Sequence, residues 1–400
     1  MKDMQDSKIF CISFFMNDIF LDSRKVKKND YFISLRGNKD DGIYHLKEII
    51  KKGGKLMYSD NFSYNYFPNL KEDLNKILIK HYKLEFKVKI IGITGTNKKT
   101  SVSYLLTKGL NRYGYKAKCI STIKGEDTYF SSLTTPRNDD LIRIIKEAEK
   151  ENLDYLIMEV SSIGYKEGRV NDIPFFLGVL TSLESDHLDY HKNIFNYHLS
   201  KIEFIEKCNN KVIGINKSKE EILRDVLSKC LKKEQINEFL LNLPQVPGRE
   251  EIINLNPLII VDYAHTSSAL EYILSKYKKK CKGKLVTIIG AGGNRDKSKR
   301  KIYGDLVYKY SDLSIITSDN PRNEDPKKII DEIIEDRENV IKIIDREKAI
   351  IYGLSLLKEN DTLLVLGKGN EEYIEINDKL LPFNDKKTVL KYLNIDLNSL

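Results

Sequence analysis

The sequence predicts an α/β protein built from three domains: a small amino-terminal α/β domain, a central domain with a parallel sheet and a Rossmann-like carboxyl-terminal domain. Three observations support this class. A chain of 400 residues is too long for one ordinary core. Short apolar runs alternate with helical patterns from about residue 86 onward, as in parallel α/β sheets. Most of these runs end in polar or Gly-rich residues, where open α/β sheets bind ligands.

Composition shifts indicate where the domains divide. Residues 1–86 differ in sequence pattern from the rest of the chain and contain "FLDSRKVKKNDYFISLRGNKDDG". The stretch "LPQVPGR" separates a helical Lys/Glu-rich segment from a new strand. Its two prolines and its glycine are residues that commonly interrupt helices and strands. We therefore predict domains at 1–86, 87–245 and 246–400.

The expected buried strands follow one another along the second and third domains. They are "FKVKIIGITG", "YLIMEVSS", "FFLGVLTSL" and "KVIGIN", then "NPLIIVDYAH", "KLVTIIGAGG", "LSIITSDN", "NVIKIID" and "DTLLVLGKG". Each is short, apolar and rich in β-branched residues, which is typical of strands covered on both faces. The "GAGG" run lacks a third glycine at the right offset, so a dinucleotide fingerprint is disfavoured.

Composition excludes several classes of protein. The formal charge of +9 is spread along the chain among Asp and Glu, with no basic stripe or aromatic platform, so nucleic acid is disfavoured as a partner. The apolar run at residues 9–21 is short and carries Asp18, and we interpret it as core, not as a signal peptide or membrane span. Five scattered cysteines favour a reduced, cytoplasmic setting.

The stretch "IIGITGTNKKTSVSYLL" resembles a phosphate-binding loop between a strand and a helix. Such an order points backbone N–H groups at an anion and lets Lys99 and Thr100 reach phosphate and Mg²⁺. The generic pattern G-x-x-x-x-G-K-[ST] is not met, however, because Ile93 and Lys98 stand at its glycine positions. Alone, the stretch is suggestive only.

Two further clusters leave alternatives open. Glu159 ends an apolar strand and is a candidate Mg²⁺ ligand, or an ordinary carboxylate paired with a lysine. His187, His191 and His198 share one face if their segment is helical throughout. They could then mark a zinc site, although no fitting fourth ligand is near, or be three satisfied histidines that cover the sheet.

Read in order, the motifs resemble the Mur ligase family, specifically its UDP-N-acetylmuramoyl-tripeptide synthetases. The motifs are "GITGTNKKT", "LTTP", "MEVSS", "SDHLDYH", "PGRE", "VDYAHT", "GAGGNRDKSKR", "SDNPRNEDP" and "GKGNEEY", and "DSRKVKKNDYFISLRGNKDDG" resembles the family's UDP-binding domain. The resemblance implies an ATP-dependent carbon–nitrogen ligase of peptidoglycan precursor synthesis. Such an enzyme phosphorylates the carboxylate of a UDP-muramoyl peptide, and an amino acid then attacks the acyl phosphate. It also implies ATP and Mg²⁺ as cofactors, a cytoplasmic monomer, and no membrane partner.

The resemblance assigns nucleotide, metal and catalytic residues. Catalytic residues would be Lys99, Glu159, His187 and Lys201, the last at the position where the family carries a carbamylated lysine. The metal would be bound by Thr100, Glu159, His187 and carbamylated Lys201. Nucleotide contacts would come from Gly95, Thr96, Asn97, Lys98, Lys99, Thr100, Ser101, Arg249, Asp262 and His265, and Tyr263 lies in the same closing motif.

Substrate residues follow from the same resemblance. They would be Ser23, Thr134, Thr135, Ser161, Arg169, Arg295, Asp319, Asn320, Arg322, Gly367 and Glu371. The form "SDNPR" matches members that add meso-2,6-diaminopimelate, whose second carboxylate Arg322 can hold bidentately. The expected reaction is therefore addition of meso-2,6-diaminopimelate to UDP-N-acetylmuramoyl-L-alanyl-D-glutamate, in preference to L-lysine.

Departures from the family pattern define the alternatives. Lys98 replaces a glycine and offers less freedom for a positive φ. Ile163, Glu167, Ser182 and Asn370 also differ, and the stretch between Lys201 and "PGRE" is shorter than usual, which predicts missing strands in the central sheet. A ligase for an acceptor outside peptidoglycan, or a catalytically impaired binding paralogue, would explain these changes.

Overall fold

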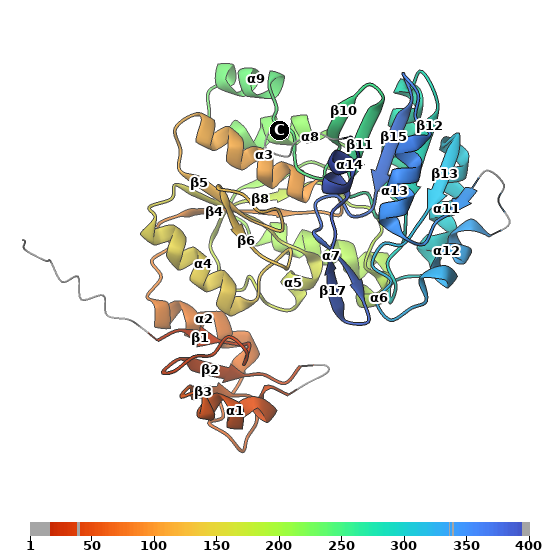
Figure 1. Ribbon diagram of the computed structural model, residues 1–400. Helices are drawn as coiled ribbons and strands as arrows, with labels where there is room; N and C mark the ends of the chain where they lie inside the picture. Colours follow the sequence, from red (N-terminus) through yellow and green to blue (C-terminus); the bar gives the residue numbers. More distant parts are fainter. Residues whose placement is uncertain (1–16, 38–40, 336, 338–339, 394–400) are drawn as a thin grey trace, which may run out of the picture. The chain divides into compact units, whose positions relative to one another are not determined.

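The computed structural model describes residues 17–37, 41–335, 337 and 340–393 (Figure 1). Of the apolar run at residues 9–21, which we interpreted as core, residues 9–16 lie outside the described residues, and Ile19 is fully buried. The described chain forms two compact units. The first comprises the residues up to Val88 with Thr135–Asn152 and Gly164–Pro174, and the second comprises the remainder.

The first unit contains a small parallel sheet in the order β1-β2-β3. Its elements are β1 (Ile19–Phe20), β2 (Tyr31–Ser34), η1 (Gly42–His45), α1 (Leu46–Lys51), β3 (Lys55–Ser59), α2 (Leu70–Tyr82) and α4 (Asn138–Lys150). Val26, Phe32 and Ile49 form its core. Helices α2 and α4 pack together, and Asn138 Nδ2 donates to Asn75 Oδ1 at 2.8 Å between them.

The second unit begins with a six-stranded sheet in the order β6-β5-β7-β4-β8-β9, parallel throughout. Its strands are β4 (Lys89–Thr94), β5 (Ala117–Ser121), β6 (Thr128–Phe130), β7 (Tyr155–Glu159), β8 (Phe175–Leu180) and β9 (Lys211–Ile213). The expected runs at β4, β7, β8 and β9 are confirmed as strands. Strands β5 and β6 were not predicted, because both are short and β5 carries a lysine in its apolar run.

Helices α3 (Lys99–Arg112), α8 (Lys219–Leu227) and α9 (Lys233–Leu241) cover one face of this sheet and share its main core. On the other face lies α7 (Ile194–Glu206), whose Phe204 meets the Phe175 ring edge to face at 4.9 Å. Gly92 permits this approach, because an added Cβ would lie 2.5 Å from Phe204 Cζ. Two short helices, α5 (Ser162–Lys166) and α6 (Leu188–His191), follow β7 and β8.

A second six-stranded sheet has the order β10-β11-β15-β12-β13-β14. Its strands are β10 (Glu251–Leu255), β11 (Leu258–Asp262), β12 (Leu285–Ile289), β13 (Leu313–Ile316), β14 (Val340–Lys342) and β15 (Thr362–Leu366). Only β10 is antiparallel to its neighbour, and the expected strands β11 to β15 are confirmed. The Rossmann-like arrangement agrees with the prediction.

Helices lie on both faces of this second sheet (Figure 1). One face is covered by α10 (Ser267–Lys280), α11 (Ser298–Tyr310) and α12 (Pro326–Ile334), and the other by α13 (Arg346–Ser355) and α14 (Asp385–Leu393). A hairpin that the sequence did not predict, β16 (Tyr373–Ile376) and β17 (Lys379–Pro382), follows β15.

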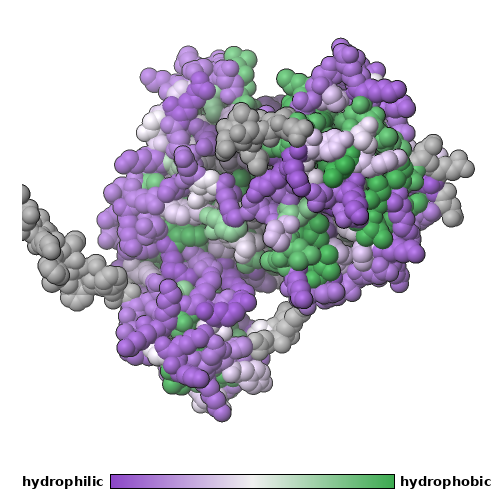
Figure 2. Space-filling view, in the orientation of Figure 1, coloured by the Kyte–Doolittle hydropathy of each residue, from purple (hydrophilic) through white to green (hydrophobic). Residues whose placement is uncertain are grey.

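The visible surface is mainly hydrophilic, with hydrophobic residues in scattered groups (Figure 2). Every helix within the described part of the chain is too short or too polar to cross a membrane.

Candidate active site

The loop after β4 has the shape of a phosphate cradle. Gly95 has φ +144°, and an added Cβ would collide with Thr181 Oγ1 and lie 2.9 Å from Ser182 N. Asn97 N donates to Ser182 Oγ at 2.9 Å, and Thr96 N donates to Ser182 O at 3.2 Å. The end of β8 therefore holds the loop, and α3 begins directly after it, with backbone N–H groups available to an anion.

Lys98 adopts the conformation that glycine would adopt most easily. Its φ is 70°, and it is the N-cap residue of α3. We expected lysine to lack this freedom, and the structure corrects that expectation, at a cost of about 1–2 kcal/mol for a side chain in the left-handed region. Lys98 Nζ donates to Lys217 O at 2.6 Å, so the side chain is anchored to the loop after β9.

Lys99 and Glu159 lie together at the base of the loop. Lys99 Nζ donates to Gly95 O at 2.9 Å and to Thr96 O at 3.0 Å. Burial lowers the pKa of Lys99, while the Glu159 charge acts in the opposite sense. Glu159 is 3% exposed, and burial raises its pKa, whereas Lys99 and the Thr100 hydroxyl lower it. An additional cation would relieve the desolvation of this carboxylate.

The three histidines do not share one helix, so the geometry that a histidine zinc site required is absent. His187 has φ 51° and precedes α6, and Asn193 starts α7 as a new helix by capping Asn196 N. His191 Nε2 pairs with Ser162 Oγ at 2.9 Å, and His198 Nε2 with Glu184 O at 3.0 Å. Within residues 17–37, 41–335, 337 and 340–393, no three His, Cys, Asp or Glu side chains gather as a metal site.

His187 belongs to an electrostatic cluster that includes Lys299 of helix α11. Its Nε2 lies 3.6 Å from Asp186 Oδ2, and Lys299 Nζ lies 2.6 Å from Asp186 Oδ1. Burial raises the pKa of Asp186, but His187 and Lys299 together bring it well below its usual range. Burial lowers the pKa of His187 and favours the neutral imidazole that binds metals.

Lys201 is a buried amine on α7 and is 1% exposed. Its Nζ has no hydrogen bond among the described residues and lies 2.9 Å from the centroid of the Tyr197 ring. Burial and the charge of Lys99 lower the pKa of Lys201 to about 6. The amine is therefore mostly neutral at pH 7, the form that reacts with carbon dioxide to give a carbamate.

Residues at the start of the second sheet contact the phosphate loop. Arg249 Nη2 lies 3.4 Å from Thr100 Oγ1, and its guanidinium lies 4.0 Å from the Tyr263 ring centroid. Asp262 accepts from Glu250 N and Ala264 N, and burial raises its pKa to about 6. Further along, Ser268 Oγ accepts from Asn97 Nδ2 at 3.1 Å. Of the other predicted nucleotide residues, Ser101 lies in α3 and His265 Nδ1 contacts Tyr263 O.

The predicted amino-acid residues gather at the carboxyl ends of β12, β13 and β15. Asn320 Nδ2 donates to Glu371 Oε2 at 2.9 Å. Glycines of this cluster approach its polar side chains closely. A Cβ atom added to Gly367 would lie 2.9 Å from Asp319 Oδ2. An added Cβ on Gly292 would likewise lie 3.0 Å from Arg322 Nη1 and 3.6 Å from Arg295 Cγ.

Two residues at this cluster were missed from the sequence. Lys368, which is fully buried, donates from Nζ to Glu371 Oε2 at 2.7 Å and to Asn320 Oδ1 at 3.1 Å. Glu375 pairs with Arg322 Nε at 2.9 Å. Lys368 could have been found in the motif "GKGNEEY", whereas nothing in the sequence marks Glu375.

The predicted acceptor residues are divided between the two units. In the first unit, Arg169 Nη1 donates to Thr135 O at 2.7 Å and Arg169 Nε to Glu167 Oε2 at 2.8 Å, and Ser23 is buried. Thr134 and Ser161 belong to the second unit.

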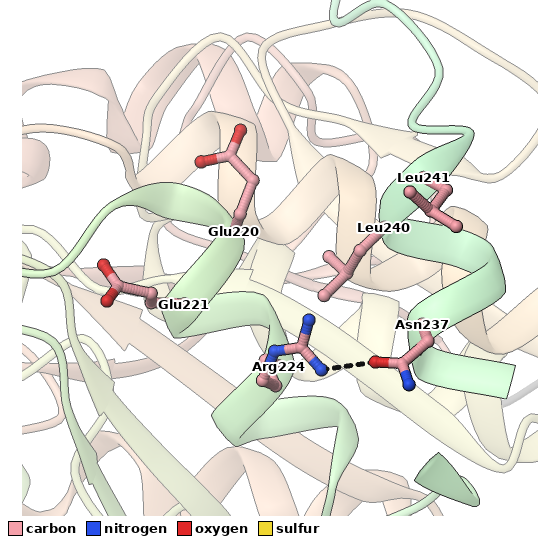
Figure 3. Close-up of a pocket in the computed structure, with 6 residues that line it drawn as sticks. All are labelled: Glu220, Glu221, Arg224, Asn237, Leu240 and Leu241. Atoms are coloured by element: carbon pink, nitrogen blue, oxygen red, sulfur yellow. Dashed lines mark hydrogen bonds between the residues drawn. The ribbon is translucent and has the colours of Figure 1, made fainter. Parts of the chain in front are cut away.

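A surface hollow is formed by other residues. It is lined by Glu220, Glu221, Arg224, Asn237, Leu240 and Leu241 of α8 and α9 (Figure 3). Arg224 Nη1 donates to Asn237 Oδ1 at 2.6 Å across it. It contains none of the predicted site residues.

The protein has a phosphate loop on a parallel sheet, and this sheet is followed by a Rossmann-like sheet. Loops at the start of the second sheet contact the phosphate loop. This arrangement is that of an α/β nucleotide-binding protein. The Mur ligase middle domain model matches residues 93–240, and the model of the Mur ligase glutamate ligase domain matches residues 248–369. The chain belongs to the Mur ligase family and is accordingly an ATP-dependent ligase that forms amide bonds.

Curated relatives extend over most of the chain. A UDP-N-acetylmuramoyl-L-alanyl-D-glutamate–2,6-diaminopimelate ligase of Clostridium botulinum is 33% identical over 449 residues, covering 92% of this chain and 93% of its own. The ligase of the same name from Aquifex aeolicus is also 33% identical, with 94% of each chain covered. The first alignment is longer than this 400-residue chain, so the relative contains residues that this chain lacks.

Solved structures share the fold. One UDP-N-acetylmuramoyl-L-alanyl-D-glutamate–2,6-diaminopimelate ligase matches with a TM-score of 0.60 and 22% identity, covering 95% of each chain. The MurF ligase of Thermotoga maritima in complex with ADP matches with a TM-score of 0.63 and 14% identity, covering 94% of this chain and 97% of that one.

Proposed function

We propose that the protein adds meso-2,6-diaminopimelate to UDP-N-acetylmuramoyl-L-alanyl-D-glutamate in peptidoglycan precursor synthesis. The observation that carries this proposal is the cluster of Asn320, Arg322 and Glu371 at the carboxyl ends of β13 and β15. Relatives that match over nine-tenths of the chain are named for this reaction. We also propose three domains, residues 1–86 for the UDP-sugar, 87–245 for ATP and 246–400 for the amino acid, in a cytoplasmic monomer.

The first half-reaction would take place at the phosphate loop. A carboxylate oxygen of the acceptor attacks the γ-phosphorus of ATP, and ADP leaves with the electron pair of the broken P–O bond. Backbone N–H groups of the loop and the Lys99 ammonium balance the negative charge that spreads over the phosphoryl oxygens. Lys99 is suited to this role because its Nζ is fixed by two loop carbonyls.

Thr100 and Glu159, which interact through their side chains, are suited to hold a magnesium ion. Thr100 and Glu159 supply hard oxygen donors, and the buried Lys201 amine would add a carbamate oxygen, with His187 as a further ligand. Bound Mg²⁺ would supply charge neutralisation for the transferring phosphoryl group. Its positive charge would also compensate the desolvation that raises the Glu159 pKa.

The second half-reaction would depend on residues of the second sheet. The amine of the amino acid attacks the acyl carbon, phosphate leaves, and the new amide nitrogen loses a proton. Arg322 can bind the carboxylate at the far end of diaminopimelate, which L-lysine does not have, and Asn320 and Glu371 add hydrogen-bonding groups. This arrangement favours diaminopimelate over L-lysine.

A second candidate is a Mur-type ligase with a different acceptor. One observation favours it: Arg169, expected to bind the acceptor, is occupied by Glu167, which contacts both Nε and Nη2 of its guanidinium. A native carboxylate at this guanidinium would compete with an anionic acceptor.

ADP formation tests the proposal and separates the two candidates. The assay contains ATP, Mg²⁺, meso-diaminopimelate and UDP-N-acetylmuramoyl-L-alanyl-D-glutamate, with each component omitted in turn. The proposal predicts that ADP forms only in the complete mixture. ADP formation that occurs only when another carboxylate acceptor, such as a glutamyl peptide, replaces the UDP-sugar would support the second candidate. Silence in the complete mixture from folded protein would contradict the proposal.

A further inference from the structure

Glu375, on the first strand of the β16–β17 hairpin, is the ionic partner of Arg322. Glu375 Oε2 lies 2.9 Å from Arg322 Nε, and Arg322 Nη1 donates to Gly293 O at 2.9 Å. No hydrogen bond of Arg322 Nη2 occurs within the described residues. The guanidinium therefore binds the Glu375 carboxylate at Nε, and its Nη2 remains available to donate to a ligand.

The backbone fixes Glu375 at this position. Arg322 N donates to Glu375 O at 3.0 Å, and Asn377 N donates to Arg322 O at 2.9 Å. Glu375 N donates to Asn320 Oδ1 at 2.9 Å. Because the hairpin is bonded directly to the loop after β13, the carboxylate of Glu375 and the guanidinium of Arg322 form one rigid pair. Their side chains are 27% and 22% exposed, so a ligand can reach both.

Two carboxylates of this cluster, Glu371 and Glu375, each have a cationic partner. Lys368 Nζ lies 2.7 Å from Glu371, which matches that carboxylate with a buried cation. Arg322 and Glu375 match each other in the same way. A neutral ion pair attracts a lone carboxylate or a lone ammonium weakly, since each would also meet a like charge. It suits a ligand that carries both charges on one carbon.

We propose that Glu375 is a specificity-determining residue that binds the distal ammonium of the amino-acid substrate, while Arg322 binds the carboxylate on the same carbon. This inference rests on the proposed function, because it concerns the far end of diaminopimelate. With the substrate carboxylate on Arg322 Nη2, the neighbouring ammonium lies on the side of Nε, where Glu375 is. Glu375 therefore keeps its pair with Arg322 and gains a second cation.

The pair would reject substrates that have only one of the two groups. L-Lysine has the distal ammonium but no carboxylate for Arg322. L-2-Aminopimelate has the distal carboxylate but no ammonium, so its carboxylate would lie beside Glu375 without a compensating cation. Loss of one charge-assisted hydrogen bond corresponds to about a tenfold or larger change in binding.

The test compares kcat and KM for meso-diaminopimelate and L-2-aminopimelate in the wild type and Glu375→Gln. We expect Glu375→Gln to raise the KM for diaminopimelate about tenfold with little change in kcat. The KM for L-2-aminopimelate should stay the same or fall, so discrimination between the two should drop about tenfold. Glu375→Asp, which retains the charge, should keep part of the discrimination, and an unchanged KM for ATP would show that the variants are folded.

Glu372→Gln is the matched control, because Glu372 is a carboxylate of the same segment that pairs with Lys124 and Lys387 instead. It should behave as the wild type. Equal effects of the Glu372 and Glu375 variants, or a KM that falls equally for both amino acids in Glu375→Gln, would overturn the role of Glu375. Wild-type enzyme that does not use meso-diaminopimelate at all would instead refute the proposed function, and the inference with it.

Discussion

Replacement of Lys201 by methionine should stabilise the protein while it destroys activity. The buried Lys201 amine forms no hydrogen bond within the part of the chain that the structure describes, and its pKa falls from 10.5 to about 6. Methionine has a similar length, carries no charge and tolerates irregular packing. The substitution therefore removes a group that folding must deprotonate, together with the amine that would become a carbamate.

The magnitude follows from proton linkage. Between pH 6 and 10.5 the unfolded chain binds a proton at Lys201 that the folded protein does not, so wild-type stability rises with pH by about 1.4 kcal/mol per unit. At pH 7.5 the difference corresponds to about 4 kcal/mol in a rigid site, and relaxation of the site reduces this to about 2 kcal/mol. Lys201→Met should be more stable by this amount, with a gap that widens toward pH 6 and closes toward pH 10.5.

Urea unfolding in carbon dioxide-free buffer at several pH values measures this gap. Bicarbonate should stabilise the wild type, because a carbamate forms from the neutral amine, and should leave Lys201→Met unchanged. A Lys201→Met protein that is less stable than the wild type, or a gap that does not vary with pH, would refute the reasoning.

Three further predictions concern other parts of the molecule. Arg346→Met should lower the free energy of unfolding by about 3–5 kcal/mol in urea titrations, because it removes the cation that pairs with the buried Asp385. Asp385 is fully buried and lies 2.7 Å from Arg346 Nε. The double variant Arg346→Met/Asp385→Leu should recover much of the lost stability. Lys98→Ala should change the KM for ATP less than about threefold, since Lys98 Nζ bonds to Lys217 O, and a tenfold change would show that the amine reaches the phosphates. Chelation of Mg²⁺ with EDTA should stop ADP formation reversibly. Glu159→Gln should lower kcat at least about a hundredfold even with excess Mg²⁺. Near-normal turnover of Glu159→Gln would show that Glu159 is not a metal ligand.

Much of the fold could be predicted because buried parallel strands have a strong local signal. The apolar runs at β4, β7, β8 and β11 are confirmed, since each is covered on both faces. Strand β6 and the β16–β17 hairpin were missed because their residues are partly exposed and their patterns are short.

The site shows where local patterns stop being informative. The family resemblance assigned both Lys99 and Arg249 to the nucleotide site, and tertiary contacts place Arg249 against Thr100, the neighbour of Lys99. The ion-pair partners of individual side chains could not be predicted. Glu375 and Arg322, for example, are brought together by the β16–β17 hairpin, which has no recognisable sequence motif. The φ of Lys98 is likewise set by the loop around it and not by the preference of lysine.

The central claim is tested most directly by a competition experiment. The enzyme is given ATP, Mg²⁺, UDP-N-acetylmuramoyl-L-alanyl-D-glutamate and equal concentrations of meso-diaminopimelate and L-lysine, and the products are identified by mass spectrometry. The account predicts a UDP-muramoyl tripeptide that carries diaminopimelate, with one ADP for each product. A product that carries lysine, or none from protein that is folded and binds ATP, would contradict it.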